Sequence, residues 1–567
     1  MQKTISSIRG LIFSALVMLP LSSFSDTSND LATNEEDVFS SNIPIVYITT
    51  SSTISKEEKV MGRMKIIDNG EGKRNHATDS VFDYNGYIGI KLRGNSSLSF
   101  DQKKYTVETW DSLGNDIKAS LLGMPAESDW VLIAPYNDIS LVRDAFAFNM
   151  WNEMGHWAPR CRMCEVFVND EYVGVYNLCE KIKRDANRVD IAKLKTEDIA
   201  DRELTGGYIV RVDAYDDEDA TFESKVPGIQ TSFWGGGNTG TVVWTIYYPK
   251  KKNLQPEQKK YIQAFVDSME VALQSAGKEN AAEEYSRWVD IPSFVDYFIH
   301  TELSLNADGF KRSAYFFKGK DKKSGEKAKM FAGPVWDYNL AYGNCNFCNA
   351  SDVEAWVYEG CSTNPTPAFW KQLTNDESFM QQVRERYAQL RSTIISQKSI
   401  DDFFDTKAAL LDEAKDRHYA KYSNLLGKDS GGGWGWWGGG NTNPVAYFAA
   451  YLVDSYEEEI STVKEWFGKR LSFLDKNWGY KESSVKTLSG YFDIEIRNAG
   501  EGKIVVCSDR DIYKITVYSL GGNKLVSQFS KSGNNCYQIQ ISDNYKKPVI
   551  VVCDAMDGNS ISRKIKL

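Results

Sequence analysis

The hydrophobic positions of this chain follow two different periods. Early segments such as "IPIVYITT", "GYIGIKLRGNSS" and "KKYTVETW" are rich in β-branched and aromatic residues, and "CEVFVNDEYVGVYNLCE" contains a hairpin turn, which is typical of strands. From Pro256 onward the apolar residues recur at helical spacing, with longer helical patterns over about 376–424 and 445–476. We therefore predict an α+β fold for residues 43–480, with strands early and helices late.

A third pattern begins after Trp478. Segments such as "YFDIEIR", "KIVVCSD", "CYQIQIS" and "PVIVVCDA" alternate at period two and are separated by turn signals. This pattern predicts a small all-β sandwich over residues 487–567. Through its strand pattern, "SLGGNKL" and the final "KIKL", the segment resembles the C-terminal sorting domains of the type IX secretion system in Bacteroidetes.

The N-terminus has the pattern of a secretory signal. In "MQKTISSIRGLIFSALVMLPLSSFSDTS", two basic residues precede an apolar run that ends in small residues, which predicts a signal peptide over residues 1–25. Residues 26–42 are acidic and polar and are predicted to be a linker. No later segment has the roughly 18 uninterrupted apolar residues that a membrane helix needs. We expect an exported protein, either secreted or at the cell surface, without a transmembrane span.

Composition and charge narrow the functional classes. The chain has 567 residues, of which 42% are hydrophobic, enough for a sizeable core and for more than one domain. Its net charge of −10 argues against nucleic-acid binding, which needs a clustered basic surface. Two CxxC pairs, "CRMC" and "CNFC", could form a zinc site, but disulfides or buried thiols are more common in an exported chain. Because nine cysteines are present, at least one is free or pairs between chains.

Two loops share nearly the same glycine-rich sequence, "FWGGGNTGT" at 233–241 and "WWGGGNTNP" at 436–444. Exposed tryptophans can stack on a sugar ring, which would make a cell-surface glycan a partner, or they can fold back on the domain. The residues concerned are Trp234, Trp434, Trp436 and Trp437.

The candidate chemistry centres on "FAGPVWDYNLAYGN", residues 331–344, in which Asp337 follows a predicted strand. Asp337 is either a buried acid that fixes a turn or a metal ligand beside a phosphate. The preceding "SAYFFKGKDKKSGEKAKMF" is predicted to be a hairpin, and before it a helix ends at "TELSLNADG", which contains Asn306 and Asp308. The order of helix, acid, hairpin and second acid is that of protein kinases, whose second acid holds the magnesium that bridges the nucleotide's phosphates.

The longer motifs carry a more specific resemblance. "GNSSLSFDQKKYTVE", "LLGMPAESDWVL", "LVRDAFAFNMW", "EVFVNDEYVGVYNLCEKIKRDANRVDI", "GGYIVRVD", "FIHTELSLNADGF" and "GPVWDYNLAYG" together resemble the spore coat protein H (CotH) kinase family, in order across roughly residues 43–480. The resemblance implies a divergent protein kinase fold and a phosphorylation reaction that uses ATP and Mg²⁺ on Ser residues of a protein substrate.

The resemblance assigns the two essential acids position by position. It implies that Asp308 lies nearest the attacking hydroxyl and that Asp337 is the metal ligand. The chain departs from the family at two places: a second acid found after Asp337 in many members is Asn339 here, and an Asn after the first acid is Ser313 here. Both replacements still offer oxygen, so the expected metal ligands are Asp308, Asp337 and Asn339.

The resemblance also implies a strand lysine that reaches the phosphates, close to the loop "RGNSS" that begins with Arg93. Lys103 and Lys104 point to opposite faces of their strand, so only one of them can do so, and we favour Lys104. Glu180 is the candidate to orient that lysine.

Four further cofactor-binding candidates remain, and three of them keep a structural alternative. Arg143 and Arg188 are suited either to a phosphate or to a buried carboxylate. Glu302 falls on the apolar face of its helix, with Asn306 one turn later, and is either a functional acid or half of an internal ion pair.

The leading hypothesis is an exported, CotH-like atypical protein Ser/Thr kinase. The alternative is a non-catalytic surface scaffold or adhesin, possibly glycan-binding, that is built on the same fold. An exported protein meets little ATP, which keeps the alternative open.

Overall fold

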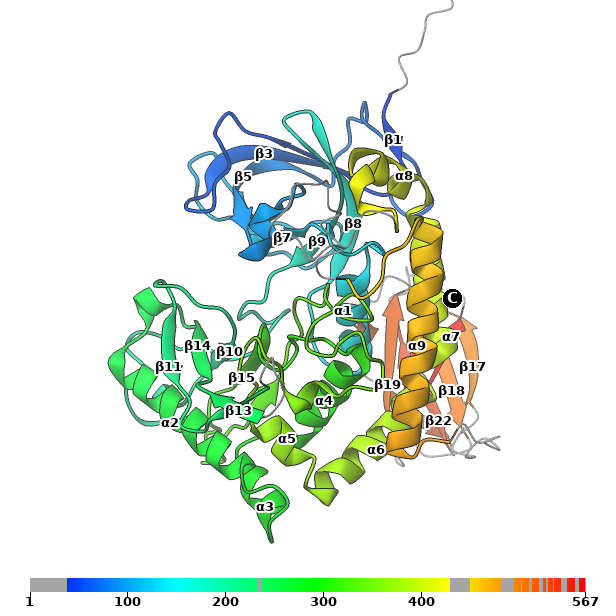
Figure 1. Ribbon diagram of the computed structural model, residues 1–567. Coiled ribbons are helices and arrows are strands. Elements are labelled where there is room, and N and C mark those ends of the chain that lie inside the picture. Colours follow the sequence, from blue (N-terminus) through cyan, green and yellow to red (C-terminus); the bar gives the residue numbers. More distant parts are fainter. Residues whose placement is uncertain are drawn as a thin grey trace, which may run out of the picture.

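The computed structural model describes residues 38–231, 237–428, 449–481 and, with short gaps, most of 494–565. The predicted signal peptide and the four loop tryptophans lie outside these residues, as does most of the predicted linker. The described part combines helices and strands (Figure 1), which confirms the mixed α+β class.

The N-terminal strands form a closed barrel. Its strands are, in spatial order, β2 (Ile45–Thr49), β3 (Val60–Ile67), β5 (Tyr84–Arg93), β6 (Lys104–Trp110), β7 (Asp129–Ile133), β9 (Glu171–Glu180) and β8 (Cys161–Val168). Every neighbouring pair is antiparallel except β2 and β8, whose parallel pairing closes the barrel. Alternating residues such as Ile88 and Ile90 fill one hydrophobic cluster. A short pair, β1 (Ser40–Ser41) with β4 (Asn75–His76), precedes and interrupts it.

A five-stranded sheet follows the barrel. Its spatial order is β11 (Ala220–Glu223), β14 (Val243–Tyr248), β10 (Tyr208–Val212), β15 (Ala314–Lys318) and β16 (Met330–Ala332). The predicted hairpin before Asp337 is the antiparallel pair β15–β16. A separate two-stranded sheet pairs β12 (Gly228–Thr231) with β13 (Gly237–Gly240).

Helices connect and flank these sheets. They are α1 (Arg143–Glu153), α2 (Pro256–Leu273), α3 (Ala281–Tyr285), α4 (Ile291–Ser304), α5 (Phe369–Leu373), α6 (Glu377–Arg391), α7 (Gln397–Leu410), α8 (Asp412–Lys421) and α9 (Tyr456–Trp478). In Figure 1, α1 lies between the barrel and α4, and the long α9 runs beside α7. Their apolar faces share one large core with the five-stranded sheet.

Helix α4 has clear start and stop signals. Asp290 caps its N-terminus by accepting a hydrogen bond from the Ser293 N–H at 3.0 Å, and Pro292 occupies its first turn. The helix ends at Ser304 because Leu305 adopts a left-handed conformation with φ of 47°. The chain therefore turns sharply just before Asn306 and Asp308.

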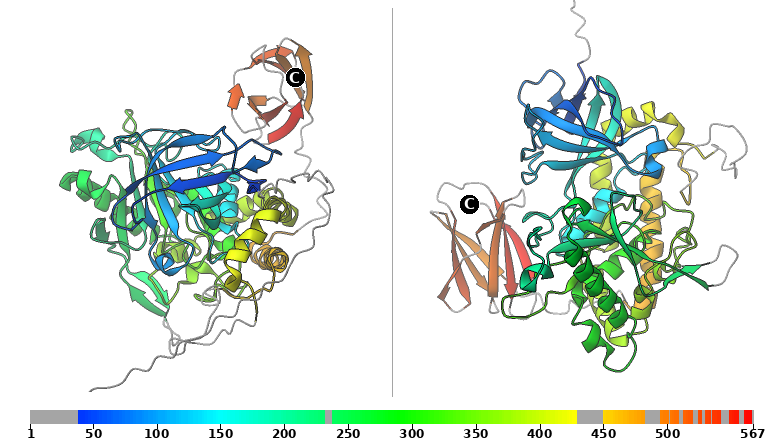
Figure 2. Two further views of the ribbon diagram at one scale, coloured as in Figure 1. Left: turned by 90° about the horizontal axis from the view of Figure 1, so that it is seen from above. Right: turned by 90° about the vertical axis from the view of Figure 1, so that its left-hand side faces the viewer.

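The C-terminal strands form two four-stranded sheets, ordered β17-β18-β22-β21 and β20-β19-β23-β24. Figure 2 shows them in orange to red as two facing sheets. Their bounds are β17 (Ile494–Gly500), β18 (Lys503–Ser508), β19 (Ile512–Ser519), β20 (Lys524–Val526), β21 (Ser530–Gly533), β22 (Cys536–Gln540), β23 (Val549–Ala555) and β24 (Ser560–Ile565). Residues of both sheets share a hydrophobic cluster whose described members all lie at or after Ile494.

The cysteines form disulfides in preference to a zinc site. Three bonds join Cys161 to Cys179, Cys348 to Cys361, and Cys507 to Cys536, whereas Cys164 and Cys345 are buried thiols. Within the described ranges, no group of three or more His, Cys, Asp or Glu side chains is arranged to hold a metal ion. The same ranges contain no helix that is both long enough and apolar enough to cross a membrane.

A chain that ends at Lys481 should remain folded. The reason is that the described core of strands β17–β24 is built from Ile494 and later residues, while the barrel and helices have their own clusters. Circular dichroism and a melting curve should show a cooperative transition within a few degrees of that of the longer chain. A molten or insoluble product would contradict the boundary near residue 480.

Candidate functional site

Asp337 is neither buried nor used to fix a turn. It follows β16, its side chain is 47% exposed, and no hydrogen bond to its carboxylate occurs within the described part of the chain. Its φ of 65° is in the left-handed region, which Asp tolerates better than most residues but at a cost. The nearest cation is the Lys104 ammonium, 3.8 Å from Oδ1. The carboxylate is therefore available for a ligand.

A second carboxyl group, that of Asp144, lies beside this pair. Asp144 is in the first turn of α1, is only 5% exposed, and accepts a hydrogen bond from the Tyr338 N–H at 2.6 Å. Burial and the charge of Asp337 together raise the pKa of Asp144 to about 7, and the charge of Lys104 opposes the shift. Sequence reasoning missed Asp144, although an acid inside the apolar helical pattern "LVRDAFAF" was a signal for it.

Two of the expected cations lie on the side of Asp337. Lys104 is paired directly opposite Arg93 across strands β5 and β6, so the two side chains share one face of the barrel wall. The Arg93 guanidinium lies over the Trp336 ring at 4.9 Å from its centroid. Lys103 is not in this group, because its ammonium donates to the carbonyls of Leu98 at 2.9 Å and Phe100 at 2.5 Å. Lys103 lies just before β6, so the structure distinguishes the two lysines by their contacts and not by opposite faces of one strand.

Asp308 lies in the turn after α4. Its N–H donates to Asn306 Oδ1 at 3.1 Å, and its Oδ1 accepts a hydrogen bond from the Lys311 ammonium at 2.8 Å. The Lys311 side chain is only 1% exposed, whereas that of Asp308 is 25% exposed. Asn306 therefore shapes the turn, and Lys311 is a contact of Asp308 that the sequence analysis did not identify.

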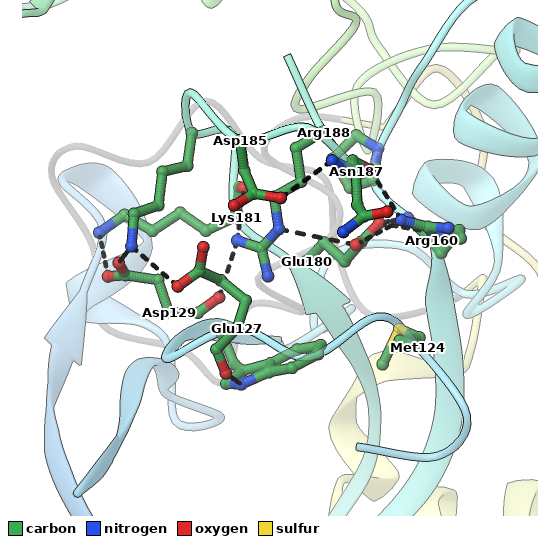
Figure 3. A network of polar contacts seen from close by, with 12 residues as sticks. Met124, Glu127, Asp129, Arg160, Glu180, Lys181, Asp185, Asn187 and Arg188 are labelled. Atoms are coloured by element: carbon green, nitrogen blue, oxygen red, sulfur yellow. Dashed lines mark hydrogen bonds and ion pairs between the residues drawn. The ribbon is translucent and has the colours of Figure 1, made fainter. Parts of the chain in front are cut away.

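Glu180 does not orient Lys104. It is fully buried at the end of β9 and forms two hydrogen bonds with the Arg160 guanidinium, at 2.8 and 2.7 Å (Figure 3). Arg188 lies on its other side, 3.6 Å away, stacks on Trp130 and donates to two backbone carbonyls. The expectation that Glu180 orients Lys104 is therefore wrong, because both of its oxygens are bound by Arg160. Arg188 is a structural residue that lies beside this buried carboxylate, and not a phosphate ligand.

Arg143 and Glu302 also take their structural alternatives. Arg143 is completely buried at the start of α1, where its Nη1 lies 2.6 Å from both Asp138 and Glu459. Glu302 is equally buried and accepts hydrogen bonds from the backbone N–H groups of Val357 and Tyr358 at 3.0 and 2.9 Å. A lone charge at either position would be costly, and each is neutralised by a partner. Neither can reach a nucleotide.

The two positions that depart from the family pattern have different contacts. Asn339 donates through Nδ2 to Asn137 Oδ1 at 2.9 Å, which ties its amide into the protein. The backbone N–H of Ser313 donates to the carboxylate of Asp213, an acid that the sequence analysis did not select. Burial raises the pKa of Asp213, and the charge of Asp337 adds to this shift. The Arg211 guanidinium lies 3.0 Å from the Asp213 carboxylate and opposes this shift.

The donor set fits magnesium held jointly with phosphates better than a cage of protein ligands alone. Mg²⁺ usually takes one or two carboxylates together with phosphate oxygens and water. Asp337 keeps a half-exposed carboxylate for this purpose, with Lys104 and Arg93 as cations on the same side, whereas one oxygen of Asp308 is already bound by Lys311. An open groove of about 900 Å³ between α7 and α9 includes none of these residues.

Comparison with known families identifies the class to which this arrangement belongs. The family model for CotH kinase protein matches residues 90–474, which is more than half of the chain and includes all the residues described above. The chain therefore belongs to the CotH kinase family. Among curated proteins, none matches the chain.

Replacing Glu302 by Gln should lower the free energy of unfolding without changing nucleotide affinity. The substitution leaves the Arg470 guanidinium, which is also fully buried, without a counter-charge, and such losses cost about 3–5 kcal/mol. Denaturant unfolding measures the first effect, and an ATP titration with magnesium measures the second. If the variant is as stable as wild type but binds the nucleotide more weakly, Glu302 is a functional residue after all.

Replacing Asp144 by Asn should raise the melting temperature more at about pH 8 than at about pH 5. Because folding raises the pKa of Asp144 to about 7, the native state holds a proton that the unfolded state releases at neutral pH. The contribution of Asp144 to the free energy of unfolding is fully present at low pH and is lost as the pH rises toward 7, where the buried carboxyl must ionise. Asn stays neutral throughout and so avoids this loss. Melting curves over this range test it, with exposed Asp190→Asn as control. A gain independent of pH contradicts the argument.

Proposed function

We propose that the protein is an exported atypical protein kinase that transfers the γ-phosphate of ATP to a Ser or Thr hydroxyl of a protein substrate. The observation that carries the proposal is the convergence of Lys104, Asp337 and Asp144 from three separate elements. Asp308 comes before β15 and Asp337 comes after β16, so both acids are attached to the open end of one hairpin. Membership of the CotH kinase family supports the same reaction class.

The proposed roles follow from charge and exposure. Lys104 and Arg93 attract the phosphate oxygens, and Asp337 offers its free carboxylate to the divalent metal. When bound, magnesium supplies positive charge that offsets the charge of the phosphates. The substrate oxygen forms a bond to the γ-phosphorus, the bond from that phosphorus to the β,γ-bridging oxygen breaks, ADP leaves, and the hydroxyl proton passes to Asp308.

Export to the cell surface or the medium is part of the proposal. The signal-like residues 1–25 and three disulfide bonds support an oxidising compartment. The two C-terminal sheets have the strand content expected of a sorting domain of the type IX kind. The scaffold hypothesis, with or without a glycan partner, is the competing outcome of the experiment below.

Asp337→Asn should abolish phosphoryl transfer and weaken binding of ATP with magnesium, while the melting temperature of the free protein stays within a few degrees of wild type. The side chain is half-exposed and accepts no hydrogen bond within the described residues, so its loss costs little stability. Saturating ATP with magnesium should stabilise the wild type by about 2.7 kcal/mol at a hundredfold excess over Kd. Lys104→Met should show the same loss of binding.

Thermal shift and transfer of labelled phosphate to a generic basic or acidic protein measure these effects, with Asp190→Asn as the surface control. If the wild type is not stabilised by ATP with magnesium, the kinase proposal fails and the scaffold hypothesis is supported. If polysaccharide retains the wild type but not a Trp234→Ala variant, the glycan-binding form of that hypothesis is supported.

A further inference from the structure

The turn that carries Asp308 is held in place by several contacts. The carbonyl of Asp308 accepts hydrogen bonds from the N–H groups of Lys311 and Arg312 at 2.9 and 2.8 Å. The Gly309 carbonyl accepts one from the buried Tyr297 hydroxyl at 2.7 Å. Phe310 is fully buried and stacks on the Trp370 ring at 4.5 Å between centroids. The backbone on both sides of Asp308 is therefore fixed by the core.

Within this turn the two charged side chains have unequal surroundings. The Lys311 ammonium is buried and donates to the Ala307 carbonyl and to Oδ1 of Asp308. The buried Cys345 thiol senses both charges. Burial and the charge of Asp308 raise the pKa of this thiol to about 12, and the charge of Lys311 opposes the shift. The carboxylate of Asp308 remains a quarter exposed, and no hydrogen bond to its Oδ2 occurs in the described part of the chain.

We infer that Lys311 is a positioning residue of the transfer reaction: it fixes Oδ1 of Asp308 and so leaves Oδ2 as the oxygen that receives the proton of the substrate hydroxyl. A lysine is suited to this because it is a point charge that occupies one carboxylate oxygen, whereas a bidentate arginine would occupy both. The inference rests on the proposed kinase function, but one of its consequences concerns stability alone.

That consequence is an asymmetry between the two partners. Removal of the Asp308 charge leaves Lys311 buried without a counter-charge, which is costly. Removal of the Lys311 charge leaves Asp308 in contact with water, which is cheap. Asp308→Asn should therefore lower the melting temperature by several degrees, Lys311→Met should lower it by less, and the double variant should recover most of the loss of the first.

The chain offers a matched control pair outside the site. Lys318 and Asp321 have the same spacing in sequence, the same 2.8 Å ammonium–carboxylate distance and a similarly unequal exposure, 0% and 15%. Asp321→Asn and Lys318→Met should reproduce the asymmetry in melting temperature. They should leave phosphoryl transfer within about twofold of wild type, because this pair lies at the other end of β15.

The decisive measurement is the transfer rate of Lys311→Met. We expect kcat to fall at least tenfold, the Kd for ATP with magnesium to stay within about twofold, and Lys311→Arg to restore only part of kcat because the guanidinium also competes for Oδ2. Transfer by Lys311→Met at the wild-type rate would overturn the inference. So would additive melting shifts in the double variant, which would mean that the two residues do not form a unit.

Failure of the proposed function is distinguishable from failure of this inference. A wild type that neither binds ATP nor transfers phosphate removes the kinase proposal, and the positioning role of Lys311 falls with it. In that case a recovered melting temperature in the double variant still shows that Asp308 and Lys311 form one buried pair. A wild type that transfers phosphate, together with an unimpaired Lys311→Met variant, leaves the kinase proposal standing and overturns the inference alone.

Discussion

The arrangement of the site depends on keeping two acids, Asp144 and Asp337, beside a single lysine, Lys104. Like charges at close range repel, and burial of Asp144 adds a desolvation cost, so the fold must impose this geometry from outside the trio. The three residues come from α1, from the turn after β16 and from β6, and no two of these elements are neighbours in sequence. The site is therefore a property of the assembled fold.

Buried arginines hold the supporting elements together. Arg143 ties the start of α1 to Glu459 of α9, and it also donates to the Ala341 carbonyl at 3.1 Å, beyond the turn that contains Asp337. Arg470 of α9 donates to the carbonyls of Glu302, Val353 and Ala355, which joins the end of α4 to the segment that follows the site. Helix α9 thus supports the segments that carry Asp337 and Asp308, although it is more than a hundred residues away from either acid in sequence.

The sequence predicted what depends on local pattern and missed what depends on packing between distant segments. The strand and helix regions, the hairpin before Asp337 and the turn at Asp308 all have local signals in hydrophobic period and turn residues. The alternation of strand residues indicated that only one of Lys103 and Lys104 could lie in the site, but not which one. The partner of Glu180, by contrast, is set by how Arg160 enters β8, and the position of Asp144 beside Lys104 is set by how α1 packs on the barrel. No spacing in a single sequence encodes these contacts.

Glu180 and Glu302 differ from Asp308 and Asp337 in how many of their carboxylate oxygens are already bound. Glu180 has both oxygens occupied by the fork of Arg160, and Glu302 has both occupied by backbone N–H groups, with Arg470 nearby. Asp308 has one oxygen bound by the Lys311 ammonium, whereas Asp337 has the Lys104 ammonium at 3.8 Å and accepts no hydrogen bond within the described residues. A fully satisfied carboxylate stabilises a fold but cannot bind anything else. A carboxylate that keeps a free oxygen beside a fixed cation can accept a proton or a metal ion. The chain places one such acid before β15 and another after β16, and both lie at the open end of this hairpin.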